Sequence, residues 1–233
     1  MRYPIVFLDA DNTLFDFSAS QYESLREAMT RFSLPFSDEI AEIYDGINTD
    51  VWKRYEQGTL THEGLFHLRF ERLLTLLHAD PDMADALNAA YEKLLETSSI
   101  LLPGAEEFCR ELAKECTLCI LTNGAEAVQK SRLSLSPIRP YITRLFISQA
   151  LGAQKPAKEF FEAVFAALGL QGDRRREAVM VGDSLPSDIL GGLNAGLDTI
   201  WFNPRGLPPT GGIQPLYTAR DYDEIKRLIL GAD

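Results

Sequence analysis

Two aspartates, Asp9 and Asp11, directly follow an apolar run in the segment FLDADNTLFDF. Such a run predicts a buried strand, and in open parallel sheets ligands bind outside the carboxyl ends of the strands. A single aspartate after a strand is commonly a helix cap or a turn residue. Two carboxylates at one strand end, with a single residue between them, make metal binding or proton transfer the chemistry to test.

Further polar side chains follow the other predicted strands. Thr122 and Asn123 come after TLCIL, Lys155 follows LFISQ, and Asp183 and Asp188 come after AVMVG. Each is a weak signal alone, since threonine is a good β former and a lysine before a helix is usually solvated. Because the carboxyl ends of parallel strands share one edge of a sheet, we expect these side chains to converge there.

Electrostatics predicts what such a cluster requires. Two carboxylates about 4 Å apart repel by roughly 4 kcal/mol at an effective dielectric constant of about 20. Several of them would destabilise the fold unless a cation lay among them. Oxygen ligands without histidine or cysteine favour Mg²⁺ over zinc, and Mg²⁺ commonly takes a phosphate oxygen as well. The sequence therefore predicts a site for Mg²⁺ and phosphate together, with Mn²⁺ as a substitute metal.

The elements that must position these residues alternate along the chain. The apolar runs YPIVFLDA, TLCILTNG, RLFISQ, AVMVGD and DTIWFNP predict strands that are covered on both faces. Between them, segments such as GAEEFCRELAKE, KEFFEAVFAALGL and LPSDILGGLNAG have the periodicity of amphipathic helices. This alternation favours an α/β fold with a doubly wound parallel sheet.

One region breaks the alternation. Residues 18–98 show only helical periodicity, as in YESLREAMTRF, DEIAEIYDGINTDVWKRYEQ and HEGLFHLRFERLLTLLHA. Asp80 before Pro81 predicts the start of a last helix, with an acid at the N-cap and proline at the first helical position. We therefore expect a core of residues 1–17 and 99–233 and an inserted helical domain of residues 18–98.

Composition narrows the class of protein. The chain has 233 residues, 45% of them hydrophobic and 24% charged, as expected of a soluble globular protein. Its net charge of −11 argues against binding a nucleic-acid polymer. We find no run of about 20 apolar residues and no signal-peptide pattern, which predicts a cytoplasmic protein that does not bind a membrane. The sequence leaves open whether it is a monomer or a homodimer.

Cys116 and Cys119 form a C-x-x-C pattern in ECTLCILTNG. A redox pair of this spacing usually lies at a helix N-terminus, whereas this one enters an apolar strand. Residues three apart in a strand point to opposite faces, and two cysteines fall short of four zinc ligands. We interpret them as buried structural thiols.

The segments DADNT, TNG, KP and GDSLPSD resemble, in this order, the four motifs of the haloacid dehalogenase superfamily. The helical insertion resembles the C1 cap of that superfamily. DADNTLFDF, NTDVWKRYEQGTLTHEGLFHLRF and DSLPSDILGGLNAGLDTIWFN are also similar to the pyrimidine 5′-nucleotidases that remove non-standard nucleotides. One departure is SQALGAQKP, because those proteins usually carry an acidic residue at the place of Ser148 or Gln149.

The resemblance implies a role for each matching residue. Asp9 would be the nucleophile that forms an aspartyl phosphate, and Asp11 the general acid and then the general base. Thr122 and the backbone of Asn123 would hold phosphate oxygens, and Lys155 would offset charge between nucleophile and phosphate.

The resemblance also implies a Mg²⁺ site. Its ligands would be Asp9, the backbone carbonyl of Asp11 and Asp183, with Asp188 binding directly or through a water molecule. Asp11 also separates the branches of the superfamily, since dehalogenases lack an aspartate at its place. A phosphatase or a phosphomutase remains.

We therefore expect a Mg²⁺-dependent phosphomonoesterase, a 5′-nucleotidase acting on pyrimidine nucleoside monophosphates. The alternatives are a sugar-phosphate phosphatase, a phosphomutase, or a non-catalytic binding protein that had no need to keep both aspartates. In the predicted cap, Trp52, Tyr55, Arg69 and Phe70 are candidates for contact with the base, although aromatic residues at helical spacing are more often packing residues.

Overall fold

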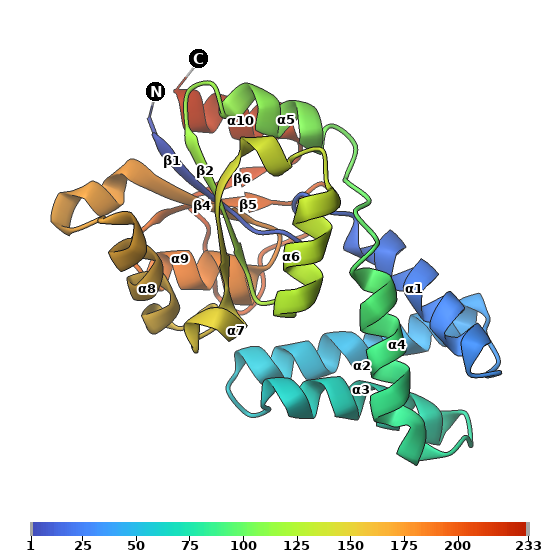
Figure 1. The fold of residues 1–233 in the computed structure, drawn as a ribbon. Coiled ribbons are helices and arrows are strands. Elements are labelled where there is room, and N and C mark those ends of the chain that lie inside the picture. Colours follow the sequence, from blue (N-terminus) through green and yellow to red (C-terminus); the bar gives the residue numbers. More distant parts are fainter. Residues whose placement is uncertain (1, 232–233) are drawn as a thin grey trace. The chain divides into compact units, whose positions relative to one another are not determined.

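The computed structural model describes residues 2–231, which divide into two compact units (Figure 1). The core unit holds the chain up to Phe17 and from Ser99 onward, and the helical unit is Ser18–Ser98. Within residues 2–231, no helix combines the length and the apolar composition that a membrane crossing requires.

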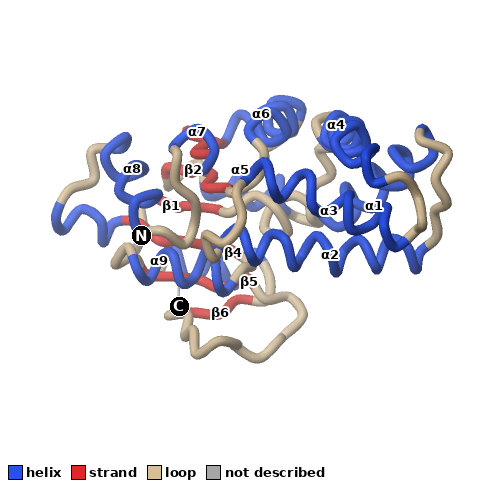
Figure 2. The backbone as a smooth tube through the Cα atoms, turned by 90° about the horizontal axis from the view of Figure 1, so that it is seen from below, coloured by secondary structure: helices blue, strands red, loops and turns tan. Residues whose placement is uncertain are grey.

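The core unit contains one six-stranded sheet in which every neighbouring pair of strands is parallel. Its strands are β1 (Ile5–Leu8), β2 (Thr117–Thr122), β3 (Ile142–Ile147), β4 (Ala178–Gly182), β5 (Asp198–Phe202) and β6 (Tyr217–Ala219). Their order is β3-β2-β1-β4-β5-β6, and Figure 2 shows β2, β1, β4, β5 and β6 following one another across the sheet. The first strand of the sequence therefore lies inside the sheet. Strands β2 and β3 are added on one side of it and β4, β5 and β6 on the other, as in a doubly wound fold.

Helices cover both faces of this sheet (Figure 1). They are α5 (Ala105–Leu112), α6 (Glu126–Leu135), α7 (Ser148–Leu151), α8 (Lys158–Leu168), α9 (Leu190–Asn194) and α10 (Tyr222–Leu230). Val6 and Leu8 of β1 pack in one buried cluster with residues of α5 and α10, whereas Phe7 packs in another with the phenylalanines of α8. Both faces of β1 are buried, which explains why its sequence is apolar without alternation.

The three cysteines are buried, and none of them forms a disulfide bond. Cys116 belongs to the buried cluster on one face of the sheet and Cys119 to the cluster on the other. Burial raises the pKa of the Cys119 thiol to about 11, which leaves it protonated and unreactive at neutral pH.

The sequence interpretation was incomplete in two places. It named five strands and missed β6, which has only three residues and follows a loop rich in proline and glycine. The predicted helix LPSDILGGLNAG begins instead as a π-helical turn, Leu185–Ile189, before α9. Ser184 caps this turn, since its side chain accepts a hydrogen bond from the amide of Ser187.

The helical unit consists of α1 from its second residue onward, α2, α3 and α4, with one short 3₁₀ turn. Their bounds are α1 (Phe17–Arg31), α2 (Asp38–Glu56), α3 (His62–Leu76), the 3₁₀ turn Pro81–Met83 and α4 (Ala84–Leu95). Asp80 is a cap as expected, but it caps the 3₁₀ turn: its carboxylate accepts from the amide of Asp82 at 3.0 Å.

An aromatic core holds α2, α3 and α4 together. The ring centroids of Tyr44, Phe70 and Tyr91 lie 5.2 to 5.7 Å from one another. Arg69 extends this core, because its guanidinium lies 5.0 Å from the ring centroid of Tyr91 and both its Nε and Nη2 donate to Oδ1 of Asn88.

Arg69 is 2% exposed and Phe70 is fully buried, both inside the helical unit. Arg69 also pairs with Glu92 of α4 at 3.4 Å. Their contact with a nucleobase stays a prediction, and their burial favours the packing role that aromatic residues at helical spacing more often have. The partners that satisfy Arg69 favour the same role, because they lie within the same unit.

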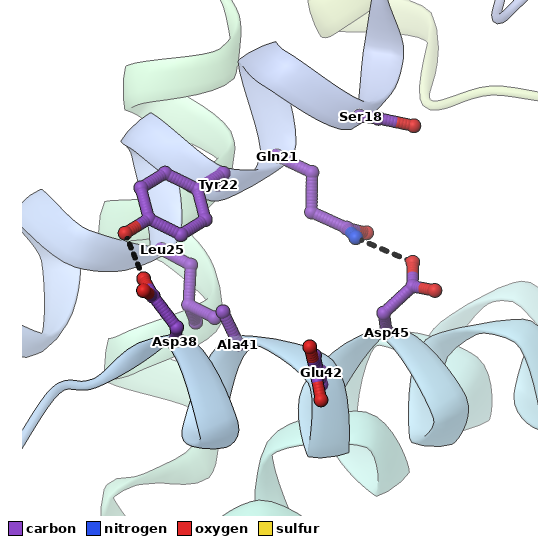
Figure 3. A pocket seen from close by; sticks show the side chains of 8 residues that line it. All are labelled: Ser18, Gln21, Tyr22, Leu25, Asp38, Ala41, Glu42 and Asp45. Atoms are coloured by element: carbon purple, nitrogen blue, oxygen red, sulfur yellow. Dashed lines mark hydrogen bonds between the residues drawn. The ribbon is translucent and has the colours of Figure 1, made fainter.

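A cleft of about 490 Å³ lies between α1 and α2 (Figure 3). Tyr22 Oη donates to Asp38 at 2.6 Å, and Gln21 Nε2 donates to Asp45 at 2.8 Å. Two of the carboxylates in the cleft are thus hydrogen-bonded across it and join α1 to α2.

We expect Arg69→Ala to lower the free energy of unfolding by about 2–4 kcal/mol, because it leaves Asn88 and Glu92 without their buried partner. Urea unfolding followed by circular dichroism measures this change. Arg72→Ala is the matched control on the same helix: Arg72 is 40% exposed and pairs with Asp50 at 2.6 Å, so its loss costs less than about 1 kcal/mol. Equal effects of the two substitutions would contradict the packing role.

Candidate active site

The loop after β1 holds Asp9 and Asp11 in a tight turn. Asn12 takes a left-handed conformation with φ of 59°, which asparagine tolerates better than most residues, and its amide donates to Phe15 O at 2.8 Å. From α10, Tyr222 Oη donates to the carbonyl of Thr13 at 2.8 Å. The two aspartates are thus set by backbone contacts on both sides of the turn.

Lys155 joins the ends of three strands. Its ammonium donates to Asp9 Oδ1 at 2.6 Å, to Asp188 Oδ1 at 2.7 Å and to the carbonyl of Leu121 at 2.7 Å. An ammonium has three donors, and all three are used here. Buried Lys155 therefore connects the end of β2 to the segments that follow β1 and β4.

Asp183 is fixed by its neighbours on β5 and on the loop after β1. Its amide donates to Thr13 Oγ1 at 3.1 Å, and Trp201 Nε1 donates to its carbonyl at 2.8 Å. Asp188 accepts from the amide of Ser184 at 3.0 Å through its second oxygen. The contact with Thr13 holds Asp183 against the loop after β1, and the contact with Ser184 orients Asp188 within the turn that follows β4.

Asp9, Asp183 and Asp188 each offer a carboxylate oxygen, and these three oxygens lie within 4.8 Å of one another. The donor set is oxygen only, as Mg²⁺ prefers, and it contains no histidine or cysteine. The residues present therefore fit a hard divalent cation.

Burial raises the pKa of Asp9 well above its ordinary value, the charge of Lys155 opposes this, and the neighbouring aspartates add to it. Burial, together with the charge of Asp188, raises the pKa of Asp183 to about 7. Burial alone would lower the pKa of Lys155, but Asp188 and Asp9 outweigh it and keep the ammonium charged. One lysine therefore does not neutralise this cluster, which leaves a demand for more positive charge.

Thr122, the last residue of β2, and Asn123, the residue after it, make different contacts. Thr122 Oγ1 accepts from the amide of Gly124 at 3.0 Å. The side chain of Asn123 makes two hydrogen bonds of 2.9 Å to the backbone of Lys155, one to its carbonyl and one from its amide. The amide group of Asn123 therefore positions Lys155, which the sequence interpretation did not foresee.

The departure in SQALGAQKP has a structural role. Gln149 accepts from the amide of Glu126 at 2.9 Å, which caps the first turn of α6, and Ser148 donates to the carbonyl of Asn123 at 3.3 Å. The side-chain oxygen of a glutamine satisfies this helix terminus as an acidic residue could, but without the charge.

Two residues of α6 were missed by the sequence interpretation. Arg132 Nη1 donates to Asp11 Oδ1 at 2.5 Å, and Gln129 Nε2 donates to Asp11 Oδ2 at 2.6 Å. The available signal was their spacing, since residues three apart lie on one side of a helix that begins just after the TNG segment.

The parallel sheet and the polar cluster at its carboxyl edge define a class of hydrolase. A family model described as haloacid dehalogenase-like hydrolase matches residues 3–196. The chain belongs to this family, and it is an enzyme of the hydrolase class.

Individual relatives match over almost their whole length. The chain is 34% identical to pyrimidine 5′-nucleotidase YjjG of Escherichia coli, over 98% of this chain and 99% of that protein. It is 33% identical to the HAD-hydrolase YfnB of Bacillus subtilis, over 98% and 96% of the two chains. A crystal structure of YfnB bound to magnesium superposes with a TM-score of 0.92 at 32% identity, covering 98% of this chain and 99% of that one.

In the metal-free protein, we expect the free energy of unfolding to fall as pH rises from about 5 to about 8. A carboxyl whose pKa is higher in the folded state than in the unfolded state stabilises the fold while protonated, and this contribution disappears as pH passes the folded pKa, about 7 for Asp183. Each unit of pKa difference corresponds to about 1.4 kcal/mol. Urea unfolding in EDTA at several pH values measures the trend.

Asp183→Asn should reduce this dependence, leaving the part due to Asp9, and make the metal-free protein more stable at pH 8. Asp173→Asn, a substitution of an exposed aspartate of the core unit, is the control and should keep the wild-type slope. A wild-type slope in Asp183→Asn would show that Asp183 is not the titrating group.

Proposed function

We propose that this enzyme is a Mg²⁺-dependent phosphomonoesterase that forms an aspartyl phosphate and acts as a 5′-nucleotidase on pyrimidine nucleoside monophosphates. The observation that carries the phosphatase part is the buried cluster of Asp9, Asp183 and Asp188 around Lys155. A phosphate dianion needs positive charge, and a chain of net charge −11 can supply it only locally.

In the first step, an Asp9 oxygen attacks phosphorus, and the bond from phosphorus to the leaving oxygen breaks. Asp11 gives its proton to that oxygen, so the product leaves as an alcohol. Lys155 orients Asp9, because its ammonium is bonded to Asp9 Oδ1 and leaves Oδ2 for the attack. Thr122 and the backbone of Asn123 hold phosphate oxygens.

In the second step, water attacks the phosphorus of the aspartyl phosphate. Asp11, now deprotonated, accepts the proton of this water, and the bond from phosphorus to the Asp9 oxygen breaks. Inorganic phosphate leaves, and both aspartates return to their starting protonation states.

Asp9, the Asp11 carbonyl and Asp183 would hold Mg²⁺, with Asp188 close to them. When bound, the ion supplies the positive charge that draws the phosphate dianion to a carboxylate nucleophile. Asp188 has one oxygen on Lys155 and the other on the amide of Ser184, which favours a supporting role for it.

The choice of substrate rests on the helical unit, which we propose acts as the cap and contacts the leaving group. Trp52, Tyr55, His62 and Phe66 form an aromatic cluster where α2 ends and α3 begins, with neighbouring ring centroids 4.3 to 6.1 Å apart. Trp52 is partly exposed and could stack on a base. YjjG and PynA, which is 32% identical over 97% of this chain and 94% of that protein, are both named as pyrimidine 5′-nucleotidases.

Asp9→Asn should lower kcat by at least about 10⁴-fold, the scale found when a covalent nucleophile is removed. The variant should fold, because the substitution relieves repulsion. EDTA should inactivate the wild type reversibly, and Mg²⁺ at about 100 times its Kd should stabilise it by about 2.7 kcal/mol. Phosphate release measures the loss of activity in the variant and in EDTA, and thermal unfolding measures the stabilisation by Mg²⁺.

Asp173→Asn, the same chemical change at an exposed site, should keep full activity. Turnover at the wild-type rate by Asp9→Asn, or by the wild type in EDTA, would overturn the mechanism.

A panel of phosphate esters should show higher kcat/KM for pyrimidine nucleoside monophosphates than for hexose phosphates, with tolerance of substituents on the base. Stacking on one ring contributes about 1–3 kcal/mol, which separates a nucleotide from a sugar phosphate but does not separate related pyrimidines strictly. Trp52→Ala should therefore weaken kcat/KM for nucleotides more than for a small generic phosphate ester.

Trp52→Phe keeps an aromatic face and is the matched control, which should retain most of the preference. Equal losses on both substrates in Trp52→Ala would make Trp52 a packing residue. A panel in which hexose phosphates are preferred would favour the sugar-phosphate phosphatase alternative and leave the phosphatase mechanism standing.

A further inference from the structure

Both oxygens of the Asp11 carboxylate are held by one side of helix α6. Arg132 Nη1 lies 2.5 Å from Oδ1, and Gln129 Nε2 lies 2.6 Å from Oδ2. Hydrogen bonds to both oxygens fix the plane of a carboxylate as well as its place. The orientation of Asp11 thus depends on residues more than a hundred positions away in the sequence.

Arg132 is built into the core and is not a surface arginine. Its side chain is 0% exposed, and its guanidinium carbon lies 4.5 Å from the ring centroid of Phe15 and 5.9 Å from that of Phe17. Phe15 in turn forms an isolated β-bridge with Asp11. A charge this deeply buried needs a charged or strongly polar partner, and Asp11 is its ion-pair partner.

Gly124 leaves the space that Gln129 occupies. A Cβ at Gly124 would lie 2.3 Å from Gln129 Nε2, closer than real Cβ atoms approach, and 3.0 Å from both its Cδ and its Cγ, so Gln129 would have to move. Gly124 is not among the described glycines with positive φ, so what a Cβ would disturb here is the place of the Gln129 side chain and not the backbone conformation.

We propose that Gln129 and Arg132 are positioning residues for Asp11. We also propose that residue 124 is a glycine because the side chain of Gln129 needs that space to reach Asp11. This inference rests on the proposed function. The ion pair with Arg132 is made by the ionised form of Asp11, which is the form that takes the proton of the attacking water. When Asp11 carries its proton, each oxygen still has a lone pair for one of the two donors, so the same orientation is kept. The two side chains thus orient Asp11 so that its proton reaches the leaving oxygen when the bond from phosphorus to that oxygen breaks. Transfer by a positioned group contributes about 10²- to 10⁴-fold.

The readout is the dependence on the leaving group. 4-Nitrophenyl phosphate releases a stable phenolate that needs no proton, whereas uridine 5′-monophosphate releases an alkoxide that does. The ratio kcat/KM reports the steps up to the first irreversible one, so it reflects the first proton transfer and not hydrolysis of the aspartyl phosphate. A lost packing contact would lower both ratios alike.

We expect Arg132→Met to lower kcat/KM about 10- to 100-fold for uridine 5′-monophosphate and less than about 3-fold for 4-nitrophenyl phosphate. Gln129→Ala should show the same selectivity with a smaller loss. Lys130→Ala is the matched control on α6, since Lys130 is exposed and pairs with Glu126 on the same helix, and it should leave both ratios unchanged.

A double-mutant cycle tests the role of Gly124 and does not need Arg132→Met to fold. Gly124→Ala alone should resemble Gln129→Ala, because it displaces the same side chain. Adding Gly124→Ala to Gln129→Ala should cost no more than Gln129→Ala alone, since the obstructing atoms are gone. Full additivity would overturn this part of the proposal.

The outcomes separate the two proposals. If the wild type hydrolyses both esters and loses both in Asp9→Asn, the proposed function holds. Equal losses on the two esters, or no loss, in Gln129→Ala then overturn the positioning role alone. A wild type that hydrolyses neither ester overturns the proposed function and this inference with it.

Discussion

The bond between one buried ammonium and two buried carboxylates organises the core unit. Lys155 reaches Asp9, Asp188 and the carbonyl of Leu121 within 2.7 Å, and these groups come from three separate segments of the chain. Burying charges is costly unless they are paired and hydrogen-bonded, so the loops that carry them have little freedom to move apart. The carboxylates still outnumber the ammonium, and this imbalance is what suits the edge of the sheet to a metal and a phosphate.

Close packing lets so many polar groups converge. A Cβ at Gly182 would lie 2.2 Å from Asp188 Oδ2, and one at Gly192 would lie 2.7 Å from Thr199 Cγ2. Together with Gly124, these glycines remove bulk where a strand end, a helix and a charged side chain meet. The glycines of the TNG and GDS segments therefore shape the site as directly as its aspartates do. The close-packed apolar sheet below the site is rigid, which keeps these short contacts in place.

Much of the core unit was predictable because its signals are local. Strands buried on both faces must be apolar throughout, and the carboxyl ends of parallel strands must share an edge, so Asp9, Asp183 and Lys155 could be placed together from the sequence. Strand β6 was not predicted, because its three residues, Tyr217–Ala219, are too few to show a hydrophobic period. The limits of the helical insertion were expected for the same local reason, since its periodicity is helical throughout.

What the sequence determined by itself was thus the order along the chain of the five longer strands and of the helices between them, and the residues at the strand ends. Only the tertiary structure decided which charged side chains are buried. Arg69 and Arg132 look alike in sequence, each on an amphipathic helix, yet Arg69 packs inside the helical unit on Asn88 while Arg132 holds Asp11. The physical reason is that an arginine is buried only where partners satisfy its charge, and those partners lie 19 and 121 residues away. Periodicity within one helix carries no information about such distant partners.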